Sequence, residues 1–184
     1  MCQCFLARAP PDSMHLLEDI RAAAKMYGVV IKAPIKGGPA VSENDLVVES
    51  LVLRELSHPN IIPLLGGGKT PSGTTFIVLE YLCGGTLRTR LDKCGGGLGI
   101  KPAVEYGRAL ASALAYMHDR ALPGMIMMHR DLKPDNIGFT STGVVKLMDF
   151  GLAKVIRRTL RSCSVKYSMT GETGSPRYMS PEVA

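Results

Sequence analysis

The sequence predicts a mixed α+β fold for this chain, and three observations support the prediction. Short β-branched and apolar runs, typical of strands, lie at residues 28–32, 61–65 and 75–79. Longer stretches with apolar residues at helical spacing lie at 43–57 and 104–120. Two further apolar runs flank turn-forming residues at 140–143, which predicts a β-hairpin over 137–148. With 184 residues, 46% hydrophobic and 21% charged, the chain has the composition of one soluble globular domain.

Composition and charge argue against several classes of protein. The net charge is +6, and the acid-free basic stretch 154–166 supplies much of it. Aromatic residues do not interleave with these basic residues, which disfavours nucleic-acid binding. No apolar run is long enough to span a membrane, and the first residues lack a signal-peptide pattern. Five cysteines without a Cys-x-x-Cys pair indicate reduced thiols, so we expect an intracellular and cytoplasmic protein.

The N-terminal part of the chain is expected to run from a tail through a helix into a strand. Residues 1–13 have the character of a tail, and 15–25 that of a short amphipathic helix. Residues 28–32 form the first strand. Because side chains alternate across a strand, Val30 and Lys32 share one face.

The helix over 43–57 carries a carboxylate on its apolar side. Its start is a plausible capping box, Ser42-Glu43-Asn44-Asp45. Glu49 lies on one helical stripe with Leu53 and Leu56. A carboxylate on such a stripe is costly unless it is paired. We therefore expect an ion pair with Lys32 rather than a solvent-facing glutamate.

The middle of the chain reads as two strands followed by two helices. A glycine-rich turn separates the strands at 61–65 and 75–79, and the second strand runs through Glu80 and Leu82 into a pair of glycines. A short helix is expected over 86–93. On the helix over 104–120, the residues that share one face by their spacing are Gly107, Leu110, Ala111, Leu114, Met117 and His118. The methionines that follow at 125, 127 and 128 are interpreted as core filler.

The stretch from His129 to Gly151 concentrates the side chains that can do chemistry. The hairpin over 137–148 brings Asn136 and Asp149 side by side, with Asp131 one loop away. Two oxygen ligands held together suit Mg²⁺, which also binds phosphate oxygens. The separate carboxylate of Asp131 can orient a hydroxyl nucleophile, and Lys133 can cover developing phosphate charge.

This stretch resembles the catalytic core of eukaryotic protein kinases. It contains both H-R-D-L-x-x-x-N, at 129–136, and D-F-G, at 149–151, in order and without a mismatch. The resemblance covers Gly28 to Ala184. It implies a two-lobed protein-kinase-like fold, with a small β-rich lobe and an incomplete helical large lobe. The expected boundaries are 1–13 for the tail, 14–184 for the partial kinase domain, 14–82 for the small lobe with its helix, and 83–184 for the truncated large lobe.

The resemblance implies an enzyme that transfers the γ-phosphoryl group of ATP to serine or threonine hydroxyls of protein substrates. Asp131, Lys133 and Asn136 would be catalytic, and Asn136 and Asp149 would hold Mg²⁺. Lys32, fixed by Glu49, would hold the inner phosphates of ATP. The residues expected around the adenine are Val30, Leu79 as gatekeeper, Glu80, Leu82 and Gly138. The residues expected to stack between the lobes are Leu53, Leu64, His129 and Phe150.

Regulation is also implied by the resemblance. Arg130 would receive phosphate from the activation segment, and Thr170 and Thr173 are the expected acceptors. Lys133 together with Ser175 resembles serine/threonine kinases rather than tyrosine kinases. The segment closes with Ser180-Pro181-Glu182, where serine replaces the usual alanine.

Several positions depart from the family pattern. No G-x-G-x-x-G precedes Lys32, and the chain stops at Ala184 before the usual C-terminal helices, as in a truncated or incompletely predicted gene product. These departures leave a second hypothesis open, a catalytically impaired kinase fragment or pseudokinase-like binding module. A third, a small-molecule kinase of related fold, is disfavoured by Ser175-Pro176 and by the closing motif, which suit peptide docking.

Two departures fall in the expected adenine pocket. Val30 stands where the family usually has alanine as the roof, and Gly138 where it usually has leucine as the floor. We hypothesise that one compensates the other, giving a lower roof over a deeper floor. The alternative is that Gly138 meets a backbone requirement of the hairpin strand.

Overall fold

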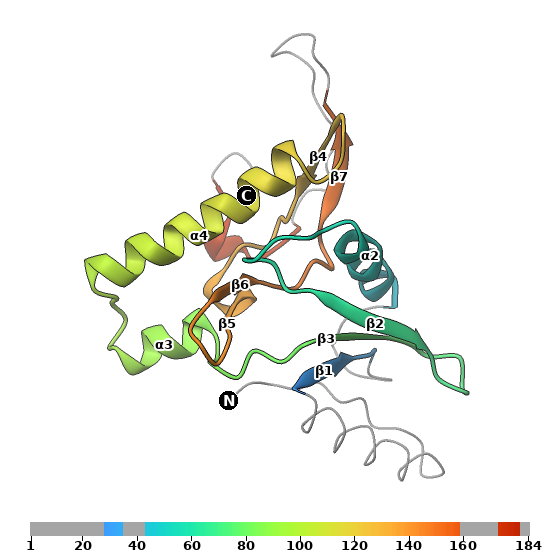
Figure 1. The fold of residues 1–184 in the computed structure, drawn as a ribbon, viewed down its shortest axis with the longest axis horizontal. Coiled ribbons are helices and arrows are strands. Elements are labelled where there is room, and N and C mark those ends of the chain that lie inside the picture. The colour runs from blue at the N-terminus through green and yellow to red at the C-terminus, as the bar shows by residue number, and fades with distance from the viewer. Residues whose placement is uncertain (1–27, 35–42, 159–172, 181–184) are drawn as a thin grey trace.

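The computed structural model describes residues 28–34, 43–158 and 173–180. The helix expected over 15–25, the acceptor Thr170 and the closing Pro181-Glu182 lie outside these residues. Within them the chain forms the mixed α+β architecture that the sequence predicts (Figure 1).

A three-stranded antiparallel sheet forms the β-rich part. Its strands are β1 (Val29–Lys32), β2 (Leu64–Lys69) and β3 (Thr75–Glu80), in the order β1-β3-β2. Pairing of Val30 with Leu79 and of Lys32 with Ile77 fixes the register of β1 on β3. The central strand β3 buries Ile77 and Leu79, as expected for a strand covered on one face.

The second strand begins and ends later than the sequence predicted. The prediction placed it at 61–65 with a turn through the following glycines, whereas β2 runs through those glycines to Lys69. The turn lies at residues 70–74, where Gly73 N–H bonds to the Thr70 carbonyl and Thr70 N–H to the Thr74 carbonyl. Cross-strand pairing with β3 therefore overrides the turn preference of the glycines.

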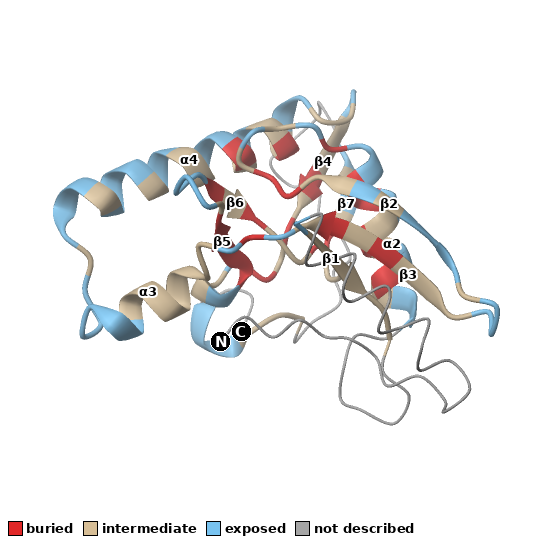
Figure 2. Ribbon diagram, turned by 60° about the horizontal axis from the view of Figure 1, so that its bottom comes forward, coloured by how far each residue is buried: buried red, intermediate tan, exposed pale blue. Residues whose placement is uncertain are grey.

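Helix α2 (Glu43–Arg54) packs against this sheet, and its buried apolar residues are Leu46, Val52 and Leu53. It ends three residues before the expected end at Ser57, whose N–H instead bonds to the Tyr116 hydroxyl at 3.0 Å. Figure 2 shows the buried side of α2 turned toward the interior of the molecule. The Ser42 end of the expected capping box lies outside the described residues.

The helical part begins with α3 (Leu87–Lys93) and α4 (Ile100–Asp119). A capping box at Thr86 and Thr89 starts α3. α4 begins four residues before the predicted start, and the predicted inner face is partly wrong. Ala113 and Met117 are its buried residues, while Gly107 and Ala111 are exposed. The elements that follow α4 include η2 (Pro134–Asn136), the hairpin β5 (Ile137–Phe139) and β6 (Val145–Leu147), and η3 (Pro176–Tyr178).

An antiparallel ribbon of β4 (Met125–Met128) and β7 (Lys154–Arg157) was not predicted. Of the three methionines interpreted as core filler, Met127 is buried, whereas Met125 and Met128 are only half-buried. β7 forms the start of the basic stretch, and Arg158 just beyond it pairs with Asp119 at 2.5 Å. The sequence signal is weak because each strand has only four residues and neither alternates apolar with polar side chains.

A backbone junction places the catalytic stretch against the segment after α2. Leu147 N–H donates to the Asn60 carbonyl at 2.8 Å, and Ile62 N–H donates to the Leu147 carbonyl at 2.9 Å. The Asn60 side chain also donates to the Val145 carbonyl at 2.9 Å. Around this junction the buried core is continuous across the molecule (Figure 2). None of the helices in the described ranges is both long enough and apolar enough to cross a bilayer.

Candidate active site

A cavity of about 550 Å³ lies between the sheet and the catalytic stretch. Its walls come from β1, the end of β3, the start of α3 and the loop before β5. The lining residues that the sequence singled out are Val30, Lys32, Glu49, Leu79, Glu80, Leu82, Lys133, Asn136 and Asp149. A site of this size that combines apolar walls with a few convergent polar groups is typical of small-molecule binding.

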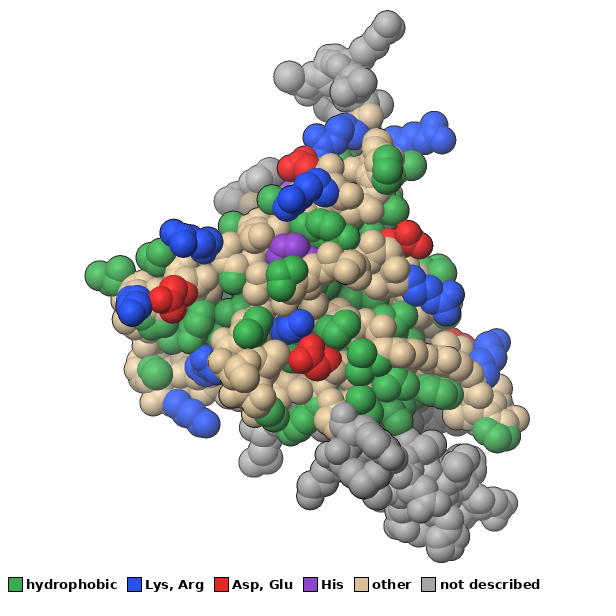
Figure 3. Space-filling model, viewed as in Figure 1, with side chains coloured by type: hydrophobic (Ala, Val, Ile, Leu, Met, Phe, Trp, Pro, Cys, Tyr) green, Lys and Arg blue, Asp and Glu red, His purple; other side chains and the backbone are tan. Residues whose placement is uncertain are grey.

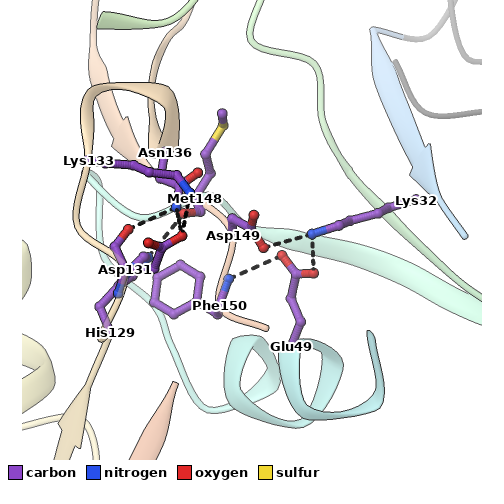
Figure 4. Close-up of polar contacts among 9 residues, drawn as sticks. All are labelled: Lys32, Glu49, His129, Asp131, Lys133, Asn136, Met148, Asp149 and Phe150. Carbon is purple, nitrogen blue, oxygen red and sulfur yellow. Dashed lines mark hydrogen bonds and ion pairs between the residues drawn. The ribbon is translucent and has the colours of Figure 1, made fainter. Parts of the chain in front are cut away.

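Lys32 lies between two carboxylates that come from distant parts of the chain. Its Nζ is 2.7 Å from Glu49 Oε2 on α2 and 2.9 Å from Asp149 Oδ1 (Figure 4). Glu49 is fully buried, and its other oxygen accepts the Phe150 N–H at 3.3 Å. The predicted ion pair is therefore present in the structure, and it also fixes the start of the Asp-Phe-Gly segment.

The pKa values of this group follow from burial and from two acids sharing one lysine. Burial lowers the pKa of Lys32, but Glu49 and Asp149 more than offset this and raise it above its usual value. Burial raises the pKa of Glu49, which the charge of Lys32 only partly counteracts. The lysine is thus held in its charged form, as a phosphate ligand requires.

His129 links the catalytic loop to the segment around Asp149. Its Nδ1 accepts the Asp131 N–H at 3.3 Å, and its Nε2 lies 3.1 Å from the Met148 carbonyl. The ring packs edge-on against Phe150, with centroids 4.8 Å apart. Burial lowers the pKa of His129, so the ring is held neutral with Nε2–H as the donor. Leu53 is buried in the same core, and Leu64 packs against that core.

The two oxygens of Asp131 have different surroundings. Oδ2 lies 2.7 Å from Lys133 Nζ and accepts a hydrogen bond of 2.9 Å from Asn136 Nδ2 (Figure 4). Oδ1 is buried and accepts no hydrogen bond from the part of the chain that the structure describes. Burial raises the pKa of Asp131, but Lys133, Ser175 and Asn136 together outweigh it and bring the pKa below its ordinary value. The result is an ionised carboxylate with one oxygen left for a ligand.

Asn136 and Asp149 lie together at the cavity, as the hairpin argument predicted. The Met148 N–H donates to the Asn136 carbonyl at 3.0 Å, which joins η2 to the residue before Asp149. Because the amide nitrogen of Asn136 is used by Asp131, its amide oxygen remains as a ligand atom. Asp149, with a side chain 44% exposed, supplies a carboxylate. One amide oxygen and one carboxylate fit Mg²⁺, which keeps several waters and takes phosphate oxygens besides.

Comparison with known proteins gives the family. The family model described as "Protein kinase domain" matches residues 20–184. The chain belongs to the protein kinase family. It is 37% identical over 172 residues to serine/threonine-protein kinase VIK of Arabidopsis thaliana, which covers 85% of this chain and 38% of that protein.

Other relatives give the same assignment over most of the kinase domain described above. Serine/threonine-protein kinase 12 of Arabidopsis thaliana is 36% identical over 178 residues, covering 94% of this chain and 36% of that protein. Serine/threonine-protein kinase Nek5 of Homo sapiens is 29% identical over 187 residues, covering 98% and 22% respectively. The chain therefore spans well under half the length of these relatives.

At the apolar end of the kinase cavity, Val30, Leu79, Glu80 and Leu82 are all lining residues, whereas Gly138 is not. A Cβ on Gly138 would lie 2.4 Å from Leu82 Cδ1, so the leucine occupies the space beside it. The hypothesis that Gly138 deepens the floor of the cavity is therefore wrong. Glu80 also pairs with Lys146 of β6 at 3.3 Å.

The regulatory residues predicted for the kinase are only partly described. Arg130 has a left-handed φ of 65° and donates from Nε to the Leu152 carbonyl at 2.7 Å. Lys133 Nζ donates to the Ser175 hydroxyl at 2.9 Å, so these two predicted residues are in contact. Thr173 is half-buried, and the other predicted acceptor, Thr170, lies outside the described residues.

Sequence reasoning missed the contribution of α3 to the site. Thr86, Arg88 and Thr89 line the cavity, and Arg88 bonds to the Tyr178 hydroxyl and lies 3.7 Å from Asp135. Nothing local marks these residues, because their role depends on how α3 packs against the loop before β5.

On the face shown in Figure 3, Lys and Arg side chains are scattered among apolar and neutral surface rather than gathered into one patch.

Proposed function

We propose that this kinase domain binds Mg-ATP and transfers its γ-phosphoryl group to serine or threonine hydroxyls of protein substrates. The observation that carries the proposal is the arrangement of Asp131. One of its oxygens is held by Lys133 and Asn136, and the other is buried without a hydrogen bond within the described residues. A buried acceptor of this kind is costly unless a ligand satisfies it.

A substrate hydroxyl is the group that suits this acceptor. Its hydrogen would bond to Asp131 Oδ1, which turns the hydroxyl oxygen toward the γ-phosphorus. The new oxygen–phosphorus bond forms as the bond between the γ-phosphorus and the bridging oxygen of ADP breaks, and Asp131 receives the proton. The lowered pKa of Asp131 suits the orienting role, because the group is ionised before substrate arrives.

The lysines would divide the phosphate charge between them. Lys133, 2.7 Å from Asp131, is placed to cover the charge on the transferring group, while Lys32 reaches the inner phosphates from β1. Asn136 and Asp149 would hold Mg²⁺, which neutralises charge between the phosphates when bound. The contact of Lys133 with Ser175 supports a serine or threonine as acceptor, by the family resemblance.

We propose further that phosphate on Thr170 or Thr173 regulates the domain through Arg130. A phosphothreonine adds charge that an arginine can pair. Thr173 lies two residues before Ser175, and Ser175 contacts Lys133. A phosphate that fixed the position of Thr173 would therefore also help to fix the catalytic loop at Lys133.

The test of the proposed function is Asp131→Asn in the purified protein. The asparagine oxygen can take the place of Oδ2, between Lys133 and Asn136, which leaves an NH₂ donor where Oδ1 was. Mg²⁺-dependent phosphate transfer should fall about 100-fold or more. Binding of a fluorescent ATP analogue should hardly change, since Asp131 is not a lining residue of the cavity.

Asp92→Asn is the matched control, because Asp92 is exposed on α3 and should leave both readouts unchanged. Equal losses of nucleotide affinity and of turnover in Asp131→Asn would contradict the role given to Asp131. Nucleotide binding by the wild type without turnover would instead support the binding-module hypothesis.

A further inference from the structure

The side chain of Leu82 lies directly against the backbone of Gly138. A Cβ built on Gly138 would meet Leu82 Cδ1 at 2.4 Å, Cβ at 3.3 Å and Cγ at 3.4 Å. Leu82 is only 5% exposed. Gly138 has no left-handed φ, so its backbone would accept a side chain. Glycine is therefore required here for space and not for conformation, which removes the backbone alternative.

Hydrogen bonds fasten the segment after Leu82 onto β5. Gly84 N–H donates to the Phe139 carbonyl at 2.9 Å, and Phe139 N–H donates to the Gly85 carbonyl at 3.0 Å. An antiparallel bridge between Thr86 and Gly138 continues this contact. Leu82 cannot retreat from a side chain at position 138 by a small backbone shift without breaking these bonds.

Leu82 also separates β5 from the cavity. It lines the cavity, whereas the three residues of β5 do not. A side chain added at Gly138 would therefore push Leu82 toward the cavity. Val30, on the opposite strand β1, lines the same apolar end but is not among the contacts of a Cβ at Gly138.

We infer that Leu82 forms the apolar wall of the nucleotide cavity on the β5 side, and that Gly138 is a positioning residue whose missing side chain lets Leu82 seat there. The side chain of Leu82 forms the part of the wall that a side chain at position 138 of β5 would otherwise form. Leu82, rather than Val30, is the residue coupled to Gly138. The inference deepens the proposed function, since it rests on a purine nucleotide as the ligand of this cavity.

The consequence is a strong interdependence of the two positions. In Gly138→Leu the added side chain displaces Leu82 into the cavity, and affinity for Mg-ATP should fall about tenfold or more, as for overpacked cores. In Leu82→Ala the wall is lost, and affinity should fall several-fold. In the double variant the new leucine replaces the old one, because truncation removes Cδ1 and Cγ of Leu82 and leaves only its Cβ at 3.3 Å, a tight contact that a shift of a few tenths of an ångström relieves. Its affinity should return to within about threefold of the wild type, since residues in contact are non-additive.

The experiment measures Mg²⁺-dependent displacement of a fluorescent ATP analogue by ATP for the four members of this cycle. Gly107→Leu is the matched control, since Gly107 is exposed on α4 with no atom within 4 Å of an added Cβ. Val30→Ala combined with Gly138→Leu is the second comparison and should show no rescue. Circular dichroism and urea unfolding without nucleotide follow folding, and Gly138→Ala replaces Gly138→Leu if the leucine variant fails to fold.

Rescue confined to the Leu82→Ala background supports the inference. Additive losses, or rescue by Val30→Ala instead, would overturn it while leaving the proposed function in place, because the wild type would still bind ATP. A wild type that bound no adenine nucleotide would overturn the proposed function and the inference together.

Discussion

Replacing Glu49 by glutamine should weaken both the fold and nucleotide binding, although the two side chains have nearly the same shape. The carboxylate of Glu49 serves two donors at once, Lys32 Nζ at 2.7 Å and the Phe150 N–H at 3.3 Å. Glutamine has one acceptor oxygen. If that oxygen faces Lys32, its NH₂ group meets the Phe150 N–H. In the reverse orientation, its NH₂ group meets the ammonium.

The size of the effect follows from the burial of the group. Glu49 is 0% exposed, so water cannot serve the donor that glutamine leaves unsatisfied. One such buried donor costs about 1–3 kcal/mol of unfolding free energy. The loss should stay below the ~3–5 kcal/mol typical of a broken buried ion pair, because Lys32 keeps Asp149 at 2.9 Å. Lys32 is then paired with Asp149 alone, and affinity for Mg-ATP should fall about tenfold, the equivalent of ~1.4 kcal/mol.

Urea unfolding and displacement of a fluorescent ATP analogue measure the two effects. Glu55→Gln is the matched control, since Glu55 is exposed just past the end of α2 and should change stability by less than about 0.5 kcal/mol. If Glu49→Gln were as stable as Glu55→Gln and bound nucleotide as tightly as the wild type, the argument from two donors and one acceptor would be refuted.

Two further predictions concern pH and phosphorylation. Because burial lowers the pKa of His129 in the fold, the unfolded chain binds more protons below about pH 6.5, and stability should fall as the pH drops from there toward the folded pKa. His129→Phe should lose much of this dependence of stability on pH, as measured by urea titrations at pH 7.5 and 5.5. His58→Gln is the comparison, because the pKa of His58 is lowered too. If His129→Phe kept the full dependence on pH, other groups would be responsible for it. If the regulatory proposal holds, mass spectrometry after incubation with Mg-ATP should find phosphate on Thr170 or Thr173, and phosphate confined to sites outside 154–175 would count against it.

The sequence predicted much of the catalytic arrangement because its signals are local or periodic. Strand alternation put Lys32 on a defined face, and the apolar stripe of α2 required a partner for Glu49; the structure joins the two at 2.7 Å. The hairpin over 137–148 was marked by its turn residues, and it brings Asn136 near Asp149 as expected. A contact that follows from one short turn or one helical repeat can be predicted without the rest of the fold.

The tertiary structure alone decided the features that depend on close approach of distant segments. The ribbon of β4 and β7 joins residues about thirty apart in sequence, and β2 takes its bounds from β3 rather than from its own glycines. Gly138 shows the same limit most clearly. Its missing side chain suggested a deeper pocket, yet the space is filled by Leu82, and backbone hydrogen bonds of Gly84 and Gly85 join the segment after Leu82 to β5. A sequence records which side chain is small, but only packing determines which neighbour occupies the space, because interiors are filled to high density.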